Sequence, residues 1–235
     1  MEKVLIVLPV IIPVIFWAAY HYHKDRHLPE PAANLLLCFL LGLGSAALSQ
    51  QMYLGLELFN LRFDAVALGA DNPGALLAYA MLAIGPIEEL AKLLPFLLVV
   101  IRFKAFDEPV DGIIYASFIG LGYAAAENFH YLDFLAPMQA AARGFASPVV
   151  HILFASIWGH WIATAKLSDK SIGFAALAGF TVAALLHGFY DFLVLLQPIA
   201  ALPIAAGLIL VLWVWRLFLL RKLHRAAVKL SNKLA

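Results

Sequence analysis

Residues 171–196 read SIGFAALAGFTVAALLHGFYDFLVLL, an apolar run in which His187 and Asp191 are the only basic or acidic side chains. A transmembrane helix needs about 20 mostly apolar residues, so this stretch predicts one. The sequence as a whole predicts an all-α, polytopic integral membrane protein with about seven transmembrane helices. The other six expected spans are residues 4–20, 32–56, 74–103, 111–129, 148–166 and 199–220.

The composition agrees with a membrane protein and excludes several other classes. Hydrophobic residues make up 64% of the chain and charged residues 13%, whereas a soluble domain has about 25% charged residues. The formal net charge of +1 excludes a strongly basic nucleic-acid binder. The single cysteine, Cys38, excludes an intrachain disulfide and a cysteine-rich zinc site. We expect one transmembrane domain over residues 1–235, surrounded by lipid bilayer in the cell membrane.

Basic residues divide the expected loops into two sets. Cytoplasmic loops of membrane proteins carry an excess of lysine and arginine. Twelve basic residues fall on one expected side and three on the other. This asymmetry predicts an N-terminus outside and a cytoplasmic C-terminus. The larger set is Lys24, Arg26, Arg102, Lys104, Lys166, Lys170, Arg216, Arg221, Lys222, Arg225, Lys229 and Lys233, and the smaller set is Lys3, Arg62 and Arg143.

Several ionisable or polar residues lie inside the expected spans, where such groups are costly and mark functional sites. Glu127 and His187 each lie sixteen residues along their spans, which places both about 24 Å from the cytoplasmic boundary. The span at residues 148–166 is expected to start at the outer side, and His151 lies near that start. We therefore expect Glu127, His151 and His187 in one outer layer of the bilayer. The residues singled out inside the spans are Glu88, Glu89, Lys92, Glu127, Asn128, His151, His160, His187 and Asp191, of which His160 is interpreted as a packing residue.

The span at residues 74–103 needs a break, because as one helix it would be about 45 Å long. The Gly85-Pro86 pair is expected to supply the break, since proline suits the first position of a helix. A helix that starts at Pro86 has Glu88 and Glu89 in its first turn, where the helix dipole favours acidic groups. Glu88 then lies about 20 Å above the inner boundary, close to the layer described above.

Two groupings of these residues are suited to proton transfer or to ion binding. Glu88 and Glu89 are adjacent, and Lys92 follows one turn later. A buried salt bridge would explain one of the carboxylates but would leave the other able to exchange a proton. His187 and Asp191 share a helix face, where the acid can orient the imidazole or bind the same ion; the alternative is a capping or interfacial pair. The sequence has no Walker loop, dinucleotide fingerprint, HExxH or GxSxG motif.

Four motifs follow one another on four consecutive expected spans. Residues 86–92, PIEELAK, resemble the EExxK motif of the PrsW family of intramembrane proteases, and the stretch 111–128 is similar to that family's second motif. His151 matches the histidine of the next span, and residues 187–191, HGFYD, match the final HxxxD. The related CAAX prenyl endoproteases have EExxxR and HxxxN, so the resemblance is to PrsW. It covers residues 74–196, the expected protease motif core.

The resemblance implies an intramembrane endopeptidase of the site-1 type. Such an enzyme hydrolyses a peptide bond of a membrane-anchored protein, classically an anti-sigma factor. Because the expected orientation and depths put the site residues in the outer layer of the bilayer, we expect the cut near its extracytoplasmic side. The resemblance also implies that Glu88, Glu89 and His187 are essential. We expect Glu88 or Glu89 to be the general base that activates water, with Lys92 holding its neighbour.

Two versions of the catalytic centre stay open at this point. In the metalloprotease version, Glu127, His151 and His187 bind Zn²⁺ with Asp191 among or beside the ligands, since three protein ligands and a water form the usual catalytic zinc site. In the glutamate-type version no metal is bound, and the histidines and Asn128 hydrogen-bond the oxyanion. The alternative function is a proton- or ion-coupled transporter, against which the chain lacks two matching halves. A non-catalytic scaffold would not need the intact motifs.

Overall fold

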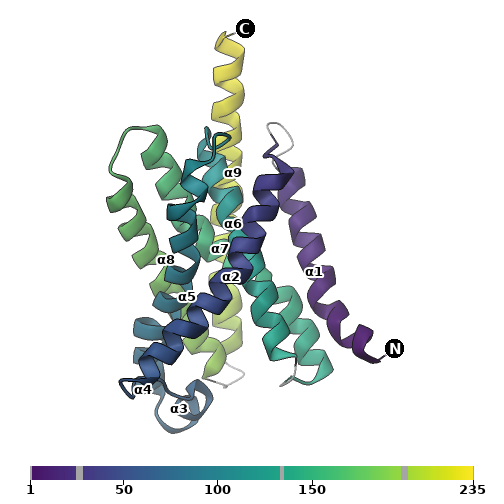
Figure 1. Ribbon diagram of the computed structural model, residues 1–235, viewed down its shortest axis with the longest axis vertical. Helices are drawn as coiled ribbons and strands as arrows, with labels where there is room; N and C mark the ends of the chain where they lie inside the picture. The colour runs from purple at the N-terminus through teal and green to yellow at the C-terminus, as the bar shows by residue number, and fades with distance from the viewer. Residues whose placement is uncertain (1, 25–28, 133–134, 197–200, 235) are drawn as a thin grey trace.

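The computed structural model describes residues 2–24, 29–132, 135–196 and 201–234. These residues form helices joined by short connections, and no strand occurs among them, so the expected all-α class is confirmed (Figure 1). The elements in chain order are α1 (Glu2–Lys24), α2 (Ala32–Glu57), α3 (Ala65–Asp71), α4 (Pro73–Tyr79), the π-helix η1 (Ala80–Ile84), α5 (Gly85–Leu98), the 3₁₀-helix η2 (Val100–Arg102), α6 (Pro109–Tyr131), α7 (Pro137–Leu167), α8 (Ile172–Leu195) and α9 (Leu202–Leu234).

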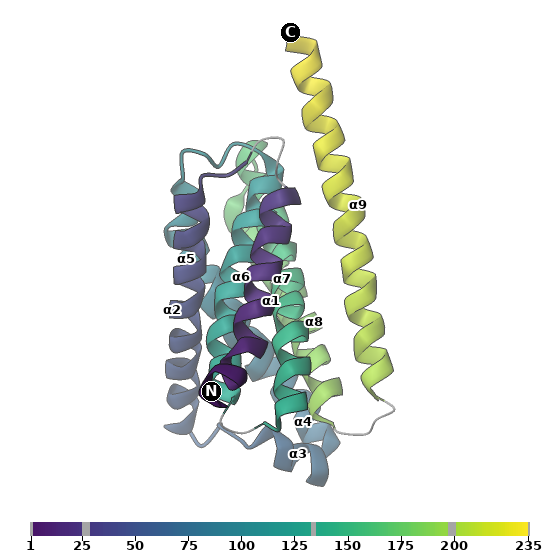
Figure 2. The same ribbon diagram turned by 90° about the vertical axis from the view of Figure 1, so that its right-hand side faces the viewer.

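Five of the helices in the described parts of the chain are long and apolar enough to cross a membrane, namely α2, α6, α7, α8 and α9. Two further segments run alongside them: α1, and the rod formed by α4, η1 and α5 (Figures 1 and 2). The two chain ends lie at opposite ends of the bundle (Figure 1). Seven spans and the orientation stay predictions. The expected span 199–220 begins outside the described residues, and α9 starts at Leu202.

The expected break at Gly85-Pro86 is wrong. Ala80, Ile84 and Gly85 all have right-handed helical dihedral angles, so the rod is continuous, although it ends at Leu98. A proline has no amide hydrogen and crowds the carbonyl four residues earlier, and the wider π-helical turn of η1 accommodates it without a break. The two adjacent glutamates therefore lie inside a continuous helix, and a free helix N-terminus does not account for their position.

Helix α7 begins at Pro137, well before the expected start at residue 148. Pro148 lies inside this helix rather than at its start. The additional turns contain a glutamine, an arginine and a serine, and were too polar to be predicted as part of a span. Arg143, expected in an outer loop, therefore lies on α7. His151 lies about four turns from the helix start, rather than in the first turn.

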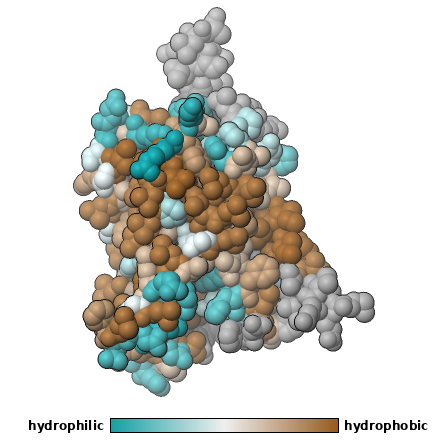
Figure 3. Space-filling view, viewed as in Figure 1, coloured by the Kyte–Doolittle hydropathy of each residue, from teal (hydrophilic) through white to brown (hydrophobic). Residues whose placement is uncertain are grey.

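Helix α6 is the centre of the bundle. In the apolar stretch of α6 that is long enough to span a membrane, 89% is buried inside the protein, compared with 17% in the corresponding stretch of α9. A Cβ atom at Gly120 would lie 2.7 Å from the His151 carbonyl oxygen, so only glycine allows α6 and α7 to pack this closely. Gly85 has the same role between α5 and α8, where a Cβ would lie 2.2 Å from the Ala184 oxygen. Hydrophobic side chains cover much of the middle of the face shown in Figure 3.

Arg216 of α9 is 1% exposed and lies inside the bundle. Its Nε donates to Ser156 Oγ on α7 at 2.9 Å, and a terminal nitrogen donates to Ser117 Oγ on α6 at 2.8 Å. No carboxylate pairs with Arg216 among the residues that the structure describes. Its expected place in the cytoplasmic basic set is wrong, and the charge asymmetry rests on the other basic residues.

Candidate active site

Glu89 is fully buried, and three side chains hold its carboxylate. Lys92, one turn further along α5, lies 2.6 Å from Oε1. His187 Nδ1 on α8 lies 2.8 Å from the same oxygen, and Trp158 Nε1 on α7 donates to Oε2 at 2.9 Å. Both oxygens of Glu89 therefore have donors, and the carboxylate has no free edge for a substrate.

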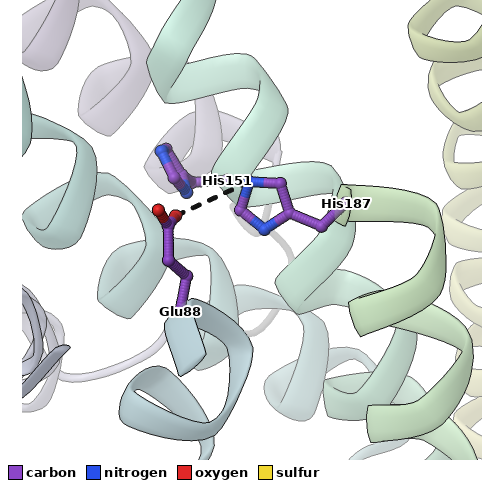
Figure 4. A group of neighbouring side chains, drawn as sticks. All are labelled: Glu88, His151 and His187. Carbon is purple, nitrogen blue, oxygen red and sulfur yellow. Dashed lines mark ion pairs between the residues drawn. The ribbon is translucent and has the colours of Figure 1, made fainter. Parts of the chain in front are cut away.

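The contact with Glu89 sets the orientation of His187. An ionised carboxylate only accepts hydrogen bonds, so the facing Nδ1 carries a proton, and in the neutral imidazole Nε2 then keeps the lone pair. Nε2 lies 3.7 Å from Glu88 Oε2 (Figure 4) and 3.6 Å from Asp191 Oδ2. Asp191 Oδ2 is buried and has no hydrogen-bond partner among the described residues. In the neutral form the Nε2 lone pair of His187 faces two carboxylate oxygens, an arrangement that a bound cation stabilises.

His151 on α7 makes two hydrogen bonds that fix its protonation pattern. An ammonium group only donates, so Lys92 Nζ donates to His151 Nδ1 at 3.1 Å. His151 Nε2 then carries the ring proton and donates it to Glu127 Oε2 at 2.9 Å. The Tyr123 ring packs against the imidazole with 4.9 Å between the ring centres. Each histidine of the site is therefore oriented by one carboxylate.

Glu88, His151 and His187 form a group that could hold a metal ion, because one ligand atom from each lies within 4.8 Å of the others. The three side chains come from α5, α7 and α8 and point toward one another (Figure 4). Two imidazoles and a carboxylate are a donor set of catalytic zinc sites. The residues present therefore fit a metal, and His151 would exchange its hydrogen bond with Lys92 for the ion.

Glu127 and Asn128, both predicted from the sequence as site residues, lie outside this group. Glu127, expected as a ligand, contacts Arg143 through Oε1 at 2.8 Å and His151 through Oε2 at 2.9 Å. Asn128, expected to stabilise the oxyanion, is 3% exposed, and neither atom of its amide has a hydrogen-bond partner in the described part of the chain. The structure thus brings Glu127 to His151, while the Asn128 amide has no partner among the described residues.

Three residues of the site were not predicted from the sequence: Arg143, Trp158 and Tyr53. Tyr53 of α2 places its hydroxyl 3.4 Å from Glu88 Oε1. Trp158 lies seven residues after His151, and Arg143 lies eight before it, so both steps keep to one face of a helix. That spacing was a usable signal once α7 is known to begin early. Nothing in the sequence distinguishes Tyr53 from the other aromatic residues.

A bundle of apolar helices around buried glutamates, two oriented histidines and a group that could hold a metal fits an intramembrane peptidase. Residues 15–220 match the family described as PrsW family intramembrane metalloprotease. The chain belongs to the PrsW family. It is an intramembrane protease and a multi-pass protein of the cell membrane, as the motifs indicated, and a transporter is not favoured.

Curated relatives agree with this assignment. Protease PrsW of Geobacillus kaustophilus (strain HTA426) is 32% identical over 186 residues, which are 79% of this chain and 77% of that protein. Protease PrsW of Clostridioides difficile (strain 630) is 30% identical over 210 residues, covering 86% and 84% of the two chains. Protease PrsW of Bacillus subtilis (strain 168) is 30% identical over 185 residues, covering 78% and 79%. No solved structure matches the chain.

Proposed function

We propose that this protease has seven spans, an external N-terminus and a cytoplasmic C-terminus, and makes a site-1 type cut near the outer end of a substrate's membrane helix. The observation that carries the proposal is where the site is exposed. The side chains of Arg143, Glu127 and Asp191 are 29%, 18% and 19% exposed. Those of Glu89 and Lys92 are 0% exposed. Water and substrate therefore reach the site from the edge that carries the first three residues.

This edge lies toward the end of the bundle at which the chain begins. Helices α6 and α8 approach that end with their last turns, and α7 starts there (Figure 2). With the N-terminus outside, the site takes water from the extracytoplasmic face. A substrate helix must unwind before it is cut, because its carbonyl groups accept i→i−4 hydrogen bonds. Unwinding is easiest near a helix end. The substrate is then a membrane-anchored protein with an external part, such as an anti-sigma factor.

The second part of the proposal is that Glu88, His151 and His187 hold Zn²⁺. The support is that one ligand atom of each residue lies within 4.8 Å of the others, and that His187 Nε2 faces Glu88 and a second carboxylate. Bound zinc supplies Lewis-acid chemistry and makes a water nucleophilic near neutral pH. Glu89 and Glu127 keep the two imidazoles in the orientations that this role requires.

In this version Asp191 is the general base. Its Oδ2 lies 3.6 Å from His187 Nε2 and has no hydrogen-bond partner among the described residues. Asp191 takes the proton of the attacking water and returns it to the leaving amine nitrogen. The Asn128 amide donates to the oxyanion that forms on the scissile carbonyl. This differs from the expectation that Glu88 or Glu89 is the base. Both oxygens of Glu89 already accept hydrogen bonds, and Glu88 is a zinc ligand in this version.

A metal-free mechanism also has one observation in its favour. The Lys92 ammonium group lies 3.1 Å from His151 Nδ1, on the lone pair that a metal would need. In this second version Glu88 is the general base, and His187 and Asn128 hydrogen-bond the oxyanion.

Zinc content and cleavage together separate the two versions. We would reconstitute the wild type, Glu88→Gln and Asp191→Asn in liposomes, measure zinc by mass spectrometry and follow cleavage of a membrane-anchored peptide. The zinc version expects close to one ion per wild-type chain, loss of the ion in Glu88→Gln, and retention of it in Asp191→Asn with kcat lowered about 100-fold or more. Glu57→Gln, which removes an exposed ion pair with Arg62, is the matched control. Full activity of thoroughly chelated wild type would contradict the zinc version.

A further inference from the structure

We propose that Arg143 is a positioning residue that sets the orientation of His151 through Glu127. Arg143 lies outside the sequence motifs and touches neither histidine of the metal-binding group. Its terminal nitrogen lies 2.8 Å from Glu127 Oε1, and the other oxygen of Glu127 lies 2.9 Å from His151 Nε2. The two contacts form an unbroken line from α7 to α6 and back to α7. The inference rests on the proposed role of His151 in the active site.

A third contact holds the Arg143 side chain in position. The Arg143 guanidinium lies over the Tyr131 ring, 3.9 Å from its centre. Tyr131 and Glu127 are four residues apart on α6, so they share one face of that helix. Arg143 therefore sits on two neighbouring side chains of α6 at once, stacked on one and paired with the other. A planar guanidinium suits this position, because it can stack on an aromatic ring and donate hydrogen bonds to a carboxylate at the same time.

The position of Arg143 determines how the Glu127 carboxylate is oriented. With Oε1 held by Arg143, Oε2 is directed at His151 Nε2 and accepts its proton. This leaves the His151 Nδ1 lone pair for the inside of the site. Without Arg143, the Glu127 side chain can rotate toward the open edge of the site, where it is already 18% exposed. His151 would then lose the acceptor that fixes its tautomer.

The pair differs from an ordinary exposed ion pair, which contributes little to stability. The chain offers such a pair as a matched control. Arg62 and Glu57 are also joined by a 2.8 Å contact, but their side chains are 38% and 61% exposed and lie beside the α2–α3 connection. A substitution of Arg62 removes the same type of interaction without touching His151.

The test compares Arg143→Gln, Arg143→Lys, Tyr131→Leu and Arg62→Gln in the full-length protein. We would measure kcat and KM on a membrane-anchored peptide, together with the thermal unfolding temperature. The ¹⁵N signals of His151 would be recorded on metal-free protein labelled at histidine, with His151→Ala to assign them. The NMR measurement reports the tautomer independently of activity.

Arg143→Gln is expected to lower kcat about 10- to 100-fold, with KM within about twofold of wild type. The His151 signals should change from one tautomer to a mixture of both. Arg143→Lys should recover part of kcat, because it keeps a donor but loses the planar stack. Tyr131→Leu should have a smaller effect of the same sign, and Arg62→Gln should behave as wild type.

Two results would overturn the inference: wild-type kcat in folded Arg143→Gln, or a loss of kcat that follows thermal stability while the His151 tautomer is unchanged. The variant His151→Ala separates this failure from that of the proposed mechanism. Full activity of His151→Ala would remove both the mechanism and the inference. An inactive His151→Ala with a fully active Arg143→Gln would remove only the role of Arg143.

Discussion

His187 Nδ1 and Glu89 Oε1 are 2.8 Å apart, and this contact joins α8 to α5 in the interior of the bundle. It determines that Nε2, and not Nδ1, faces Glu88 and Asp191. Glu89 also neutralises Lys92, which is fully buried beside it. One carboxylate therefore has two separable tasks, to hold the imidazole and to balance a buried charge.

The variant Glu89→Ala should lose both tasks. It leaves Lys92 buried without a carboxylate, and removing one member of a buried ion pair costs about 3–5 kcal/mol. The double variant Glu89→Leu with Lys92→Met removes both charges, so its thermal stability should recover in part while activity stays absent. Thermal unfolding and peptide cleavage measure the two effects. An active double variant would show that Glu89 has no role in orienting His187.

Gly120 should matter more than an ordinary helical glycine. A Cβ there would lie 2.7 Å from the backbone oxygen of His151, so Gly120→Ala must separate α6 from α7. Such overpacking costs about 1–3 kcal/mol, and it should also lower activity by stretching the contact between Glu127 and His151.

Gly44 of α2 is the matched control for this substitution. A Cβ at Gly44 would meet no atom of the described residues within 4 Å. Gly44→Ala should therefore be neutral or stabilise the protein by up to about 1 kcal/mol. Thermal unfolding and peptide cleavage compare the two variants, and equal effects on cleavage would contradict this account.

Zinc should stabilise the folded protein if the proposed ligands bind it. A ligand present at 100 times its Kd stabilises the folded state by about 2.7 kcal/mol. Thermal unfolding of purified wild type should therefore move to higher temperature when zinc is added after chelation. Glu88→Gln should show little or no shift, because it removes the carboxylate from the three proposed ligands, whose ligand atoms lie within 4.8 Å of one another. A shift of the same size in the variant would remove Glu88 from the ligand set.

The position of the cut tests the orientation. Cleavage should fall near the outer end of the substrate's membrane helix, because the exposed edge of the site lies toward the N-terminal end of the bundle. The new terminus can be mapped by mass spectrometry, and reporter fusions at both ends of the protease give its topology. A cut at the cytoplasmic end, or a C-terminal reporter outside, would contradict the proposed orientation.

Much of the helical framework could be predicted, because a chain in a bilayer must satisfy its backbone groups within helices. The helix ends of α2, α6 and α8 lie within about two residues of the expected spans. The early start of α7 could not be predicted, since hydropathy does not detect polar helical turns. The continuity of the rod through Pro86 depends on the π-turn of η1, which hydropathy and proline preference do not reveal.

That Glu127, His151 and His187 lie at one level of the bundle could be predicted, but their pairing could not. Counting residues along each span gives the depth of Glu127 or His187, and the two histidines do meet, with 5.1 Å between their ring centres. Depth does not give the rotation of each helix about its axis. It therefore could not indicate that Glu127 faces Arg143, or that Lys92 holds Glu89 rather than Glu88.

From the contacts of Arg216 we expect a fixed order of assembly during synthesis. Inserting an arginine at the centre of a membrane helix costs about 2.5–3.5 kcal/mol, and its hydroxyl partners lie on α6 and α7, which leave the ribosome earlier. Ser117 and Ser156 do not depend on α9 in return, because each also donates to a backbone oxygen of its own helix. We therefore expect the dependence to run one way, with the earlier helices associating before α9 is made and α9 inserting stably only once they have done so.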